Sequence, residues 1–202
     1  DSICYYLEEV YSPEISKSAC WSADIGVVIK SSTNPAPEGL QIISSKFVDV
    51  NTGIYIDNVN AIEPEGFIQN NHINARIYGL ILKGKRFVNV DNNLFYTSNT
   101  DDFVMLLLER SEKIIISRNT FHYPDRMQVQ SGISIKIDKE VEDVVISENL
   151  FNAPKIAIYI SKFSKDIHTY NNTFLKENKI TKIKLNEVEI YDENRKWLDF
   201  LS

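Results

Sequence analysis

An asparagine two residues before a bulky apolar residue recurs through most of the chain. The phrases are NNHI at 70–73, NNLF at 92–95, RNTF at 118–121, ENLF at 148–151 and NNTF at 171–174. Their last residues are 22, 26, 30 and 23 residues apart. A period of this length without helical spacing is typical of a solenoid, in which each repeat contacts only the repeats beside it.

Two kinds of short apolar phrase alternate along the same region. The first kind includes GIYI at 53–56, GLIL at 79–82 and GISIKI at 132–137, and the second kind leads into each asparagine, as in KIIISRNTF at 113–121. Apolar residues alternate with other residues within each phrase, which indicates strands with one buried side. The sequence therefore predicts an all-β, parallel β-helix of about six coils over residues 25–190.

The repeated asparagine is predicted to be architectural. Asparagine tolerates the left-handed backbone of a tight turn, and its amide can bond the asparagines of the coils above and below. Contact with a ligand is the alternative interpretation. The five residues expected in one column are Asn71, Asn93, Asn119, Asn149 and Asn172.

The two ends of the chain break the repeat. Residues 1–24 and 191–202 are expected to form irregular caps that cover the terminal strand edges, and 1–24 could instead continue from a longer protein. Cys4 and Cys20 lie in the first of these segments. Two cysteines fix no compartment and match no zinc spacing, and free thiols are favoured over a disulfide.

Composition argues against several classes of function. The chain has 202 residues and a formal net charge of −6, with its basic residues scattered singly. Nucleic acid is therefore an unexpected partner. No apolar run reaches the length of about 18 residues that a membrane span needs, so no membrane insertion is expected. No histidine pair has metal spacing, and neither a metal nor another cofactor is expected.

The combination of GI.I strands, I.I..N.F strands and an asparagine ladder resembles the right-handed parallel β-helix, or pectin-lyase-like, superfamily over roughly residues 25–190. This superfamily contains pectate lyases, polygalacturonases, alginate-modifying enzymes and bacteriophage tailspikes. The resemblance implies a carbohydrate-active protein, most like a tailspike, that binds and cleaves a bacterial surface polysaccharide as a glycoside hydrolase or a polysaccharide lyase. It also implies a homotrimer in a virion tail, outside the cell or on its surface. The alternative is a non-catalytic structural or receptor-binding domain of a larger protein.

Four carboxylates are candidate catalytic residues. The stretch 99–102 resembles the polygalacturonase motif, with Asp101 in the place of a catalytic carboxylate and Asp102 beside it as a possible proton-sharing partner. Aligning the strands places Glu109 and Asp138 on adjacent coils, about 5 Å apart at the backbone, which is close to the carboxyl separation of a retaining glycosidase. The structural alternatives are a turn at 99–102 and a solvated charge ladder that includes Lys85.

Candidate substrate-binding residues combine rings that stack on sugars with charged groups that bond hydroxyls or uronates. They are Tyr55, Lys83, Lys136 and Tyr159 on strands, and His122, Tyr123 and Arg126 in the loop 122–131. A surface loop or a trimer contact is the alternative for 122–131. Ile81, Met105 and Leu107 are expected to point outward and to be covered by another subunit around a threefold axis.

Overall fold

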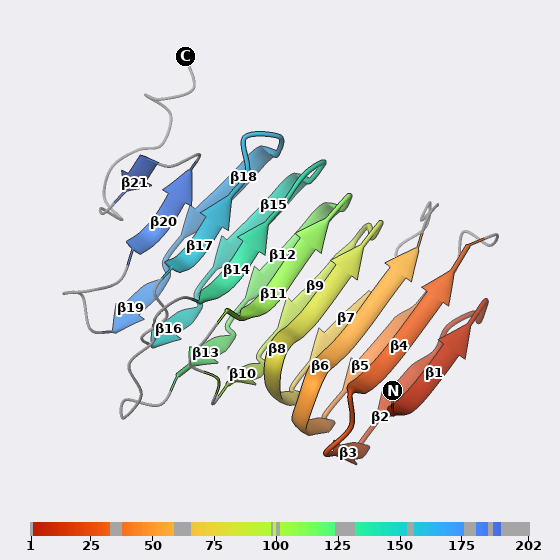
Figure 1. The fold of residues 1–202 in the computed structure, drawn as a ribbon. Coiled ribbons are helices and arrows are strands. Elements are labelled where there is room, and N and C mark those ends of the chain that lie inside the picture. The colour runs from red at the N-terminus through yellow and green to blue at the C-terminus, as the bar shows by residue number, and fades with distance from the viewer. Residues whose placement is uncertain are drawn as a thin grey trace.

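The structure of the chain is a computed structural model. It describes residues 2–32, 38–58, 66–97, 99, 102–123, 132–152 and 156–175, and the backbone of 181–185 and 188–190. These residues form strands and turns stacked as a parallel β-solenoid (Figure 1). The predicted fold class is confirmed. Within the described part of the chain, no helix is long and apolar enough to cross a membrane.

Each coil contributes strands to three faces. The first face contains β1 (Ile3–Glu8), β4 (Ile25–Ser31), the second halves of β6 (Lys46–Asn58) and β8 (His72–Lys83), β11 (Val104–Glu109), β14 (Ile133–Ile137), β17 (Ile156–Ile160) and β20 (Thr181–Leu185). The second face contains β2 (Glu14–Ser16), β5 (Leu40–Ile43), β7 (Gly66–Gln69), β9 (Val88–Asp91), β12 (Glu112–Ser117), β15 (Glu142–Ser147) and β18 (Lys165–Tyr170). The third face contains β3 (Ala19–Trp21), the first halves of β6 and β8, β10 (Leu94–Tyr96), β13 (Thr120–His122), β16 (Leu150–Asn152) and β19 (Thr173–Leu175). A further strand, β21 (Val188–Ile190), pairs antiparallel with β20.

The regular stack begins before the predicted boundary at residue 25. Strands β1, β2 and β3 pair in parallel with β4, β5 and β6, so the described residues before 25 form a full coil and not an irregular cap. The second face is a seven-stranded sheet with one strand per coil. One of these strands precedes residue 25, which leaves the predicted six for residues 25–190. The predicted cap at 191–202 lies outside the described residues.

A column of aromatic rings runs along the interior. Phe95 stacks on Phe121 with ring centroids 5.0 Å apart, Phe121 stacks on Phe151 at 5.0 Å, and Phe151 stacks on Phe174 at 5.1 Å. Phe47 and Ile73 continue the column on the earlier coils, because the register pairs Phe47 with Ile73 and Ile73 with Phe95. The repeated apolar residue of the sequence is therefore the central column of the core.

The five repeated asparagines form the predicted ladder. The Nδ2 group of Asn93 donates to Oδ1 of Asn119 at 3.0 Å, and the backbone N–H of Asn93 donates to the same oxygen at 2.9 Å. A second bond runs from Nδ2 of Asn93 to the carbonyl oxygen of Ile68, one coil back. The same bonds recur from Asn71 through Asn172, and all five asparagines are buried. The turn residue before each asparagine has a positive φ, as at Asn92 (52°).

Glycine recurs at the start of the first-face phrases because neighbouring coils leave no room for a side chain. A Cβ on Gly79 would collide with the carbonyl oxygen of Met105 on the next coil and would lie 2.9 Å from the ring of Phe95. Gly53 is enclosed in the same way by Gly79 and Ile73. The glycines therefore allow the chain to pass from the third face to the first directly over the core.

The three apolar side chains that were expected to point outward do not share one environment. Ile81 pairs with Leu107 on the next coil, and Leu107 pairs with Lys136. Met105 belongs to the core, and Ile81 and Leu107 are only 7% and 8% exposed within the single chain. The expectation that these three side chains are exposed is wrong. The homotrimer remains a prediction, but these three side chains no longer support it.

Cys4 and Cys20 form a disulfide, which corrects the preference for free thiols. The bond joins β1 to β3 across the first coil, and Cys20 is buried in the core. Cys20 takes the core position that Phe47 takes on the next coil, because the two residues pair in register. The disulfide therefore ties down the coil at the N-terminal end of the stack.

Replacing both cysteines with alanine should lower the free energy of unfolding by about 3 kcal/mol, because the bond closes a loop of 16 residues in the unfolded chain. Urea unfolding of the double variant and of the oxidised wild type measures the difference. A reductant should bring the wild type to the urea midpoint of the variant. A wild-type midpoint that is insensitive to reductant would contradict the prediction.

Candidate functional site

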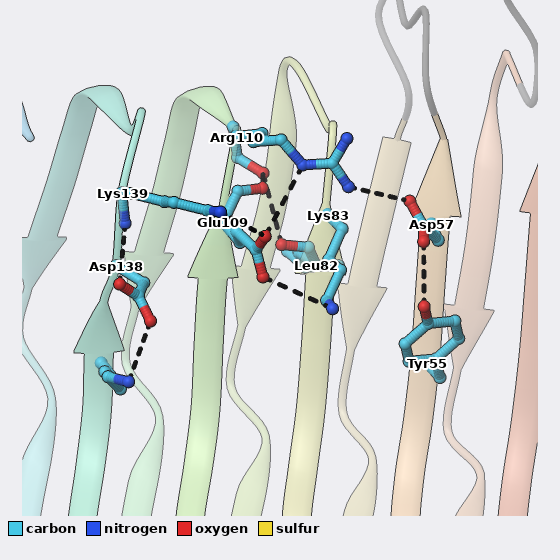
Figure 2. A network of polar contacts seen from close by, with 10 residues as sticks. Tyr55, Asp57, Leu82, Lys83, Glu109, Arg110, Asp138 and Lys139 are labelled. Carbon is cyan, nitrogen blue, oxygen red and sulfur yellow. Dashed lines mark hydrogen bonds and ion pairs between the residues drawn. The ribbon is translucent and has the colours of Figure 1, made fainter.

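A row of alternating charges follows the C-terminal ends of the first-face strands. The register pairs Glu8 with Lys30, Lys30 with Asp57, Asp57 with Lys83 and Lys83 with Glu109. Opposite charges that face each other on adjacent strands stabilise the pairing of those strands. The term charged strip is used below for Tyr55, Asp57, Lys83, Glu109, Arg110, Lys136, Asp138 and Lys139 (Figure 2).

Glu109 lies at the centre of the charged strip, among three cations (Figure 2). Its Oε2 atom is 3.4 Å from Nζ of Lys83, and its Oε1 atom is 3.7 Å from Nε of Arg110 and 3.9 Å from Nζ of Lys139. Arg110 also reaches across Lys83 to Asp57, with 3.4 Å between its terminal nitrogen and Oδ1. One arginine therefore joins carboxylates from two different coils.

Tyr55 is held against Asp57 on the same strand. Its hydroxyl donates to Oδ2 of Asp57 at 2.9 Å. Burial, which is the largest cause, together with the hydrogen bond to Asp57 and the charge of that carboxylate raises the pKa of Tyr55 to about 12. The ammonium groups of Lys30 and Lys83, from the two neighbouring coils, lie 5.9 and 5.8 Å from the ring centroid. A sugar ring that stacked on Tyr55 would have to displace one of these lysines.

Asp138 lies on the coil after Glu109, as the sequence predicts, because Leu108 pairs with Ile137 directly before them. Its Oδ2 atom is 2.9 Å from Nζ of Lys136, and its Oδ1 atom accepts the backbone N–H of Lys139 at 3.0 Å. Each of the two carboxylates therefore contacts cations. A charge ladder, the structural alternative, describes this arrangement, but Lys83 and not Lys85 lies opposite Glu109.

The remaining predicted site residues are spread over the molecule. Asp101 and Arg126 lie outside the described residues. Asp102 precedes β11, whereas Glu109 ends that strand, so the structure does not bring these two carboxylates together at one strand edge. Tyr159 pairs with Lys136 on the first face and is half-buried.

Two predicted surface residues are buried. Tyr123 is 1% exposed and stacks on Phe103 in the core at 5.7 Å, so its ring is not available to a polysaccharide. Lys85 is also fully buried, in the turn that follows β8, and does not belong to an exposed ladder. Each of these two residues comes shortly after the end of a strand, and the alternation of apolar residues in the sequence does not show where that strand ends.

A second row of side chains follows the third face, all polar or aromatic except Val48, and His122 belongs to it. The term outer row is used below for Trp21, Val48, Asn74, Tyr96, His122 and Asn152, which pair in register from β3 to β16. Each member directly follows a residue of the core column. Only His122 among them was a predicted site residue. The others could have been found from the sequence, because most of them directly follow the repeated Phe or Ile.

The described residues contain no group of three or more His, Cys, Asp or Glu side chains that could hold a metal ion. His72 and His122 lie on different coils of the third face, and His168 lies on the second face. Burial lowers the pKa of His72, and the charge of Lys46 lowers it further.

Comparison with known proteins shows to which family the chain belongs. A search of curated proteins and a search of solved structures found no significant match. The model of one protein family matches residues 4–197, which is nearly the whole chain and includes every coil described above. The chain therefore belongs to the family described as periplasmic copper-binding protein (NosD).

Proposed function

We propose that this protein is a β-helix outside the cytoplasm that binds an acidic polysaccharide along the charged strip without cleaving it. Two independent observations support the location. The family is described as periplasmic, and the Cys4–Cys20 disulfide is a bond that forms and persists in oxidising compartments.

The observation that carries the proposal is a group of loosely paired cations. The charged strip holds four cations and three carboxylates, a net charge of +1 in a chain of −6. The ion pairs of Arg110 and Lys139 are 3.4 to 3.9 Å long, whereas Lys136 and Asp138 are 2.9 Å apart. Long ion pairs at a protein surface contribute little to stability. The side chains of Arg110 and Lys139 are 36% and 57% exposed, so both can turn toward the carboxylates of a ligand.

The same geometry supports binding rather than cleavage. A glycosidase needs one protonated and one ionised carboxyl group beside the same bond. Glu109 and Asp138 contact cations instead.

Copper, which the family description names, does not fit the side chains of the described residues. Cysteine, methionine and histidine are the protein ligands that copper prefers. Both cysteines are in the disulfide, Met105 is buried in the core, and the three histidines lie on separate strands. No step of the proposed function involves copper.

Affinity gel electrophoresis in gels that contain polygalacturonate or alginate tests the proposal. The wild type should be retarded, and the retardation should weaken with salt because the interaction is between exposed charges. The double variant Arg110→Ala, Lys139→Ala should bind about tenfold more weakly, since two charge-assisted contacts are lost.

The matched control is the double variant Lys17→Ala, Lys46→Ala, which removes two exposed positive charges at the start of the third face, away from the charged strip, and should bind like the wild type. Equal weakening of binding in both double variants would show that only the net charge of the protein matters. A wild type that is not retarded would contradict the proposal. Reducing ends and unsaturated uronates should stay absent after long incubation.

A further inference from the structure

We propose a second binding site, for a neutral glycan, along the outer row of the third face. The six members of the outer row are Trp21, Val48, Asn74, Tyr96, His122 and Asn152. The core column lies directly behind them, from Cys20 to Phe151. Because side chains alternate between the two sides of a strand, the outer row points away from the core.

The spacing of the outer row suits a polymer. Adjacent members lie on adjacent coils, so they repeat about every 4.8 Å along the solenoid axis. This distance is similar to the length of one sugar unit in an extended chain. A glycan that runs parallel to the axis would therefore meet a new side chain at nearly every unit.

The central members are fixed by contacts with each other. The rings of Tyr96 and His122 stack with centroids 5.6 Å apart and an angle of 12° between their planes. Nδ1 of His122 is 3.0 Å from Nδ2 of Asn152. With the amide as donor, Nδ1 accepts, and in the neutral ring the proton is on Nε2, which becomes a donor for a ligand.

The chemistry of the outer row matches hydroxyl groups rather than ions. Amides and the tyrosine hydroxyl both donate and accept hydrogen bonds, as sugar hydroxyls do. No member of the row is an acid, a lysine or an arginine. Two described charges beside the row neutralise each other, because Arg76 pairs with Asp49 at 2.6 Å and Asp49 also accepts the hydroxyl of Ser22 at 3.2 Å.

Trp21 supplies an apolar platform at one end of the row. Its side chain is 61% exposed, on the first coil that the disulfide ties down. A wide ring with one polar N–H group is suited to contact with the apolar face of a sugar while its neighbours bond the hydroxyls. The combination of one exposed indole, the apolar Val48 beside it and the amide, phenol and imidazole groups of the other members points to a neutral polysaccharide.

Affinity gel electrophoresis with hydroxyethyl cellulose, galactomannan and dextran in separate gels tests this site. The wild type should be retarded in at least one gel, and Trp21→Ala and His122→Ala should each bind about tenfold more weakly in it, because each removes one contact to the sugar. Circular dichroism should show that both variants are folded. Phe163→Ala, which removes another exposed aromatic ring, should bind like the wild type.

The inference is overturned if the wild type passes through all three neutral gels unretarded, or if Trp21→Ala and His122→Ala are retarded as strongly as the wild type. A loss of binding in Phe163→Ala that equals theirs would also overturn it. The outer row and the charged strip share no residue. The double variant Arg110→Ala, Lys139→Ala should therefore bind the neutral polymer normally, so failure of one site leaves the other proposal standing.

Discussion

Replacing Phe121 with alanine should lower the free energy of unfolding by about 4 kcal/mol. The ring is fully buried and lies between Phe95 and Phe151, with 5.0 Å between centroids on each side. Its removal deletes two stacking contacts and leaves a cavity between rings that are each fixed by their own coil. Because a coil in a solenoid contacts only its two neighbours, the defect weakens both interfaces of that coil at once.

Urea unfolding followed by circular dichroism measures the effect of Phe121→Ala. Phe163→Ala is the matched control, since Phe163 is 62% exposed and its removal should change stability by less than about 0.5 kcal/mol. A shift of the same size in both variants would show that the phenylalanine column is not the main source of cohesion between coils.

The phenylalanine column and the asparagine ladder could be predicted from sequence because each coil repeats the same turn followed by the same buried residue. The residue before Asn119 has the positive φ of the tight turn, and the buried position after it needs a side chain that bonds across coils, so Asn119 and Phe121 recur as a unit. Repetition also gives many observations of one pattern. The fold and the third-face register follow from it.

The first-face register could not be predicted in the same way. Residues Met105 to Leu108 are all apolar and all buried, so alternation does not show which of them point inward. The structure pairs Leu107 with Ile81, and this choice brings Glu109 opposite Lys83. The row of alternating charges therefore depends on this register. In the sequence, the register can be recognised only by aligning the charged residues at the ends of the strands.

The candidate site was predicted in part for a related reason. Glu109 and Asp138 are on adjacent coils as predicted, but their roles depend on which cations their side chains meet, and Lys139 and Arg110 come from turns outside the repeat. Trp21 was missed because the first coil has Cys20 in place of the aromatic core residue. A different residue at the core position makes the repeat hard to recognise in the sequence, although the backbone pairs in the same register.

Replacing Asn119 with alanine should lower the free energy of unfolding by about 4 kcal/mol, although the side chain is polar. Its Nδ2 group donates to the carbonyl oxygen of Val90 and to Oδ1 of Asn149, and its Oδ1 atom accepts both the N–H and the Nδ2 of Asn93. Alanine would remove these four hydrogen bonds, which join Asn119 to buried groups of the two neighbouring coils. A buried group that loses its partner costs about 1 to 3 kcal/mol unless water reaches it.

Asn74→Ala is the control for Asn119→Ala, because it makes the same chemical change on the outer surface of the third face, where water replaces the amide. The control should unfold within about 0.5 kcal/mol of the wild type in urea. Asn119→Asp separates shape from hydrogen bonding, since a carboxylate fills the same space but cannot donate to Val90 or Asn149. If the ladder stabilises the stack through its bonds, Asn119→Asp should be at least as unstable as Asn119→Ala, and an aspartate variant as stable as the wild type would contradict the prediction.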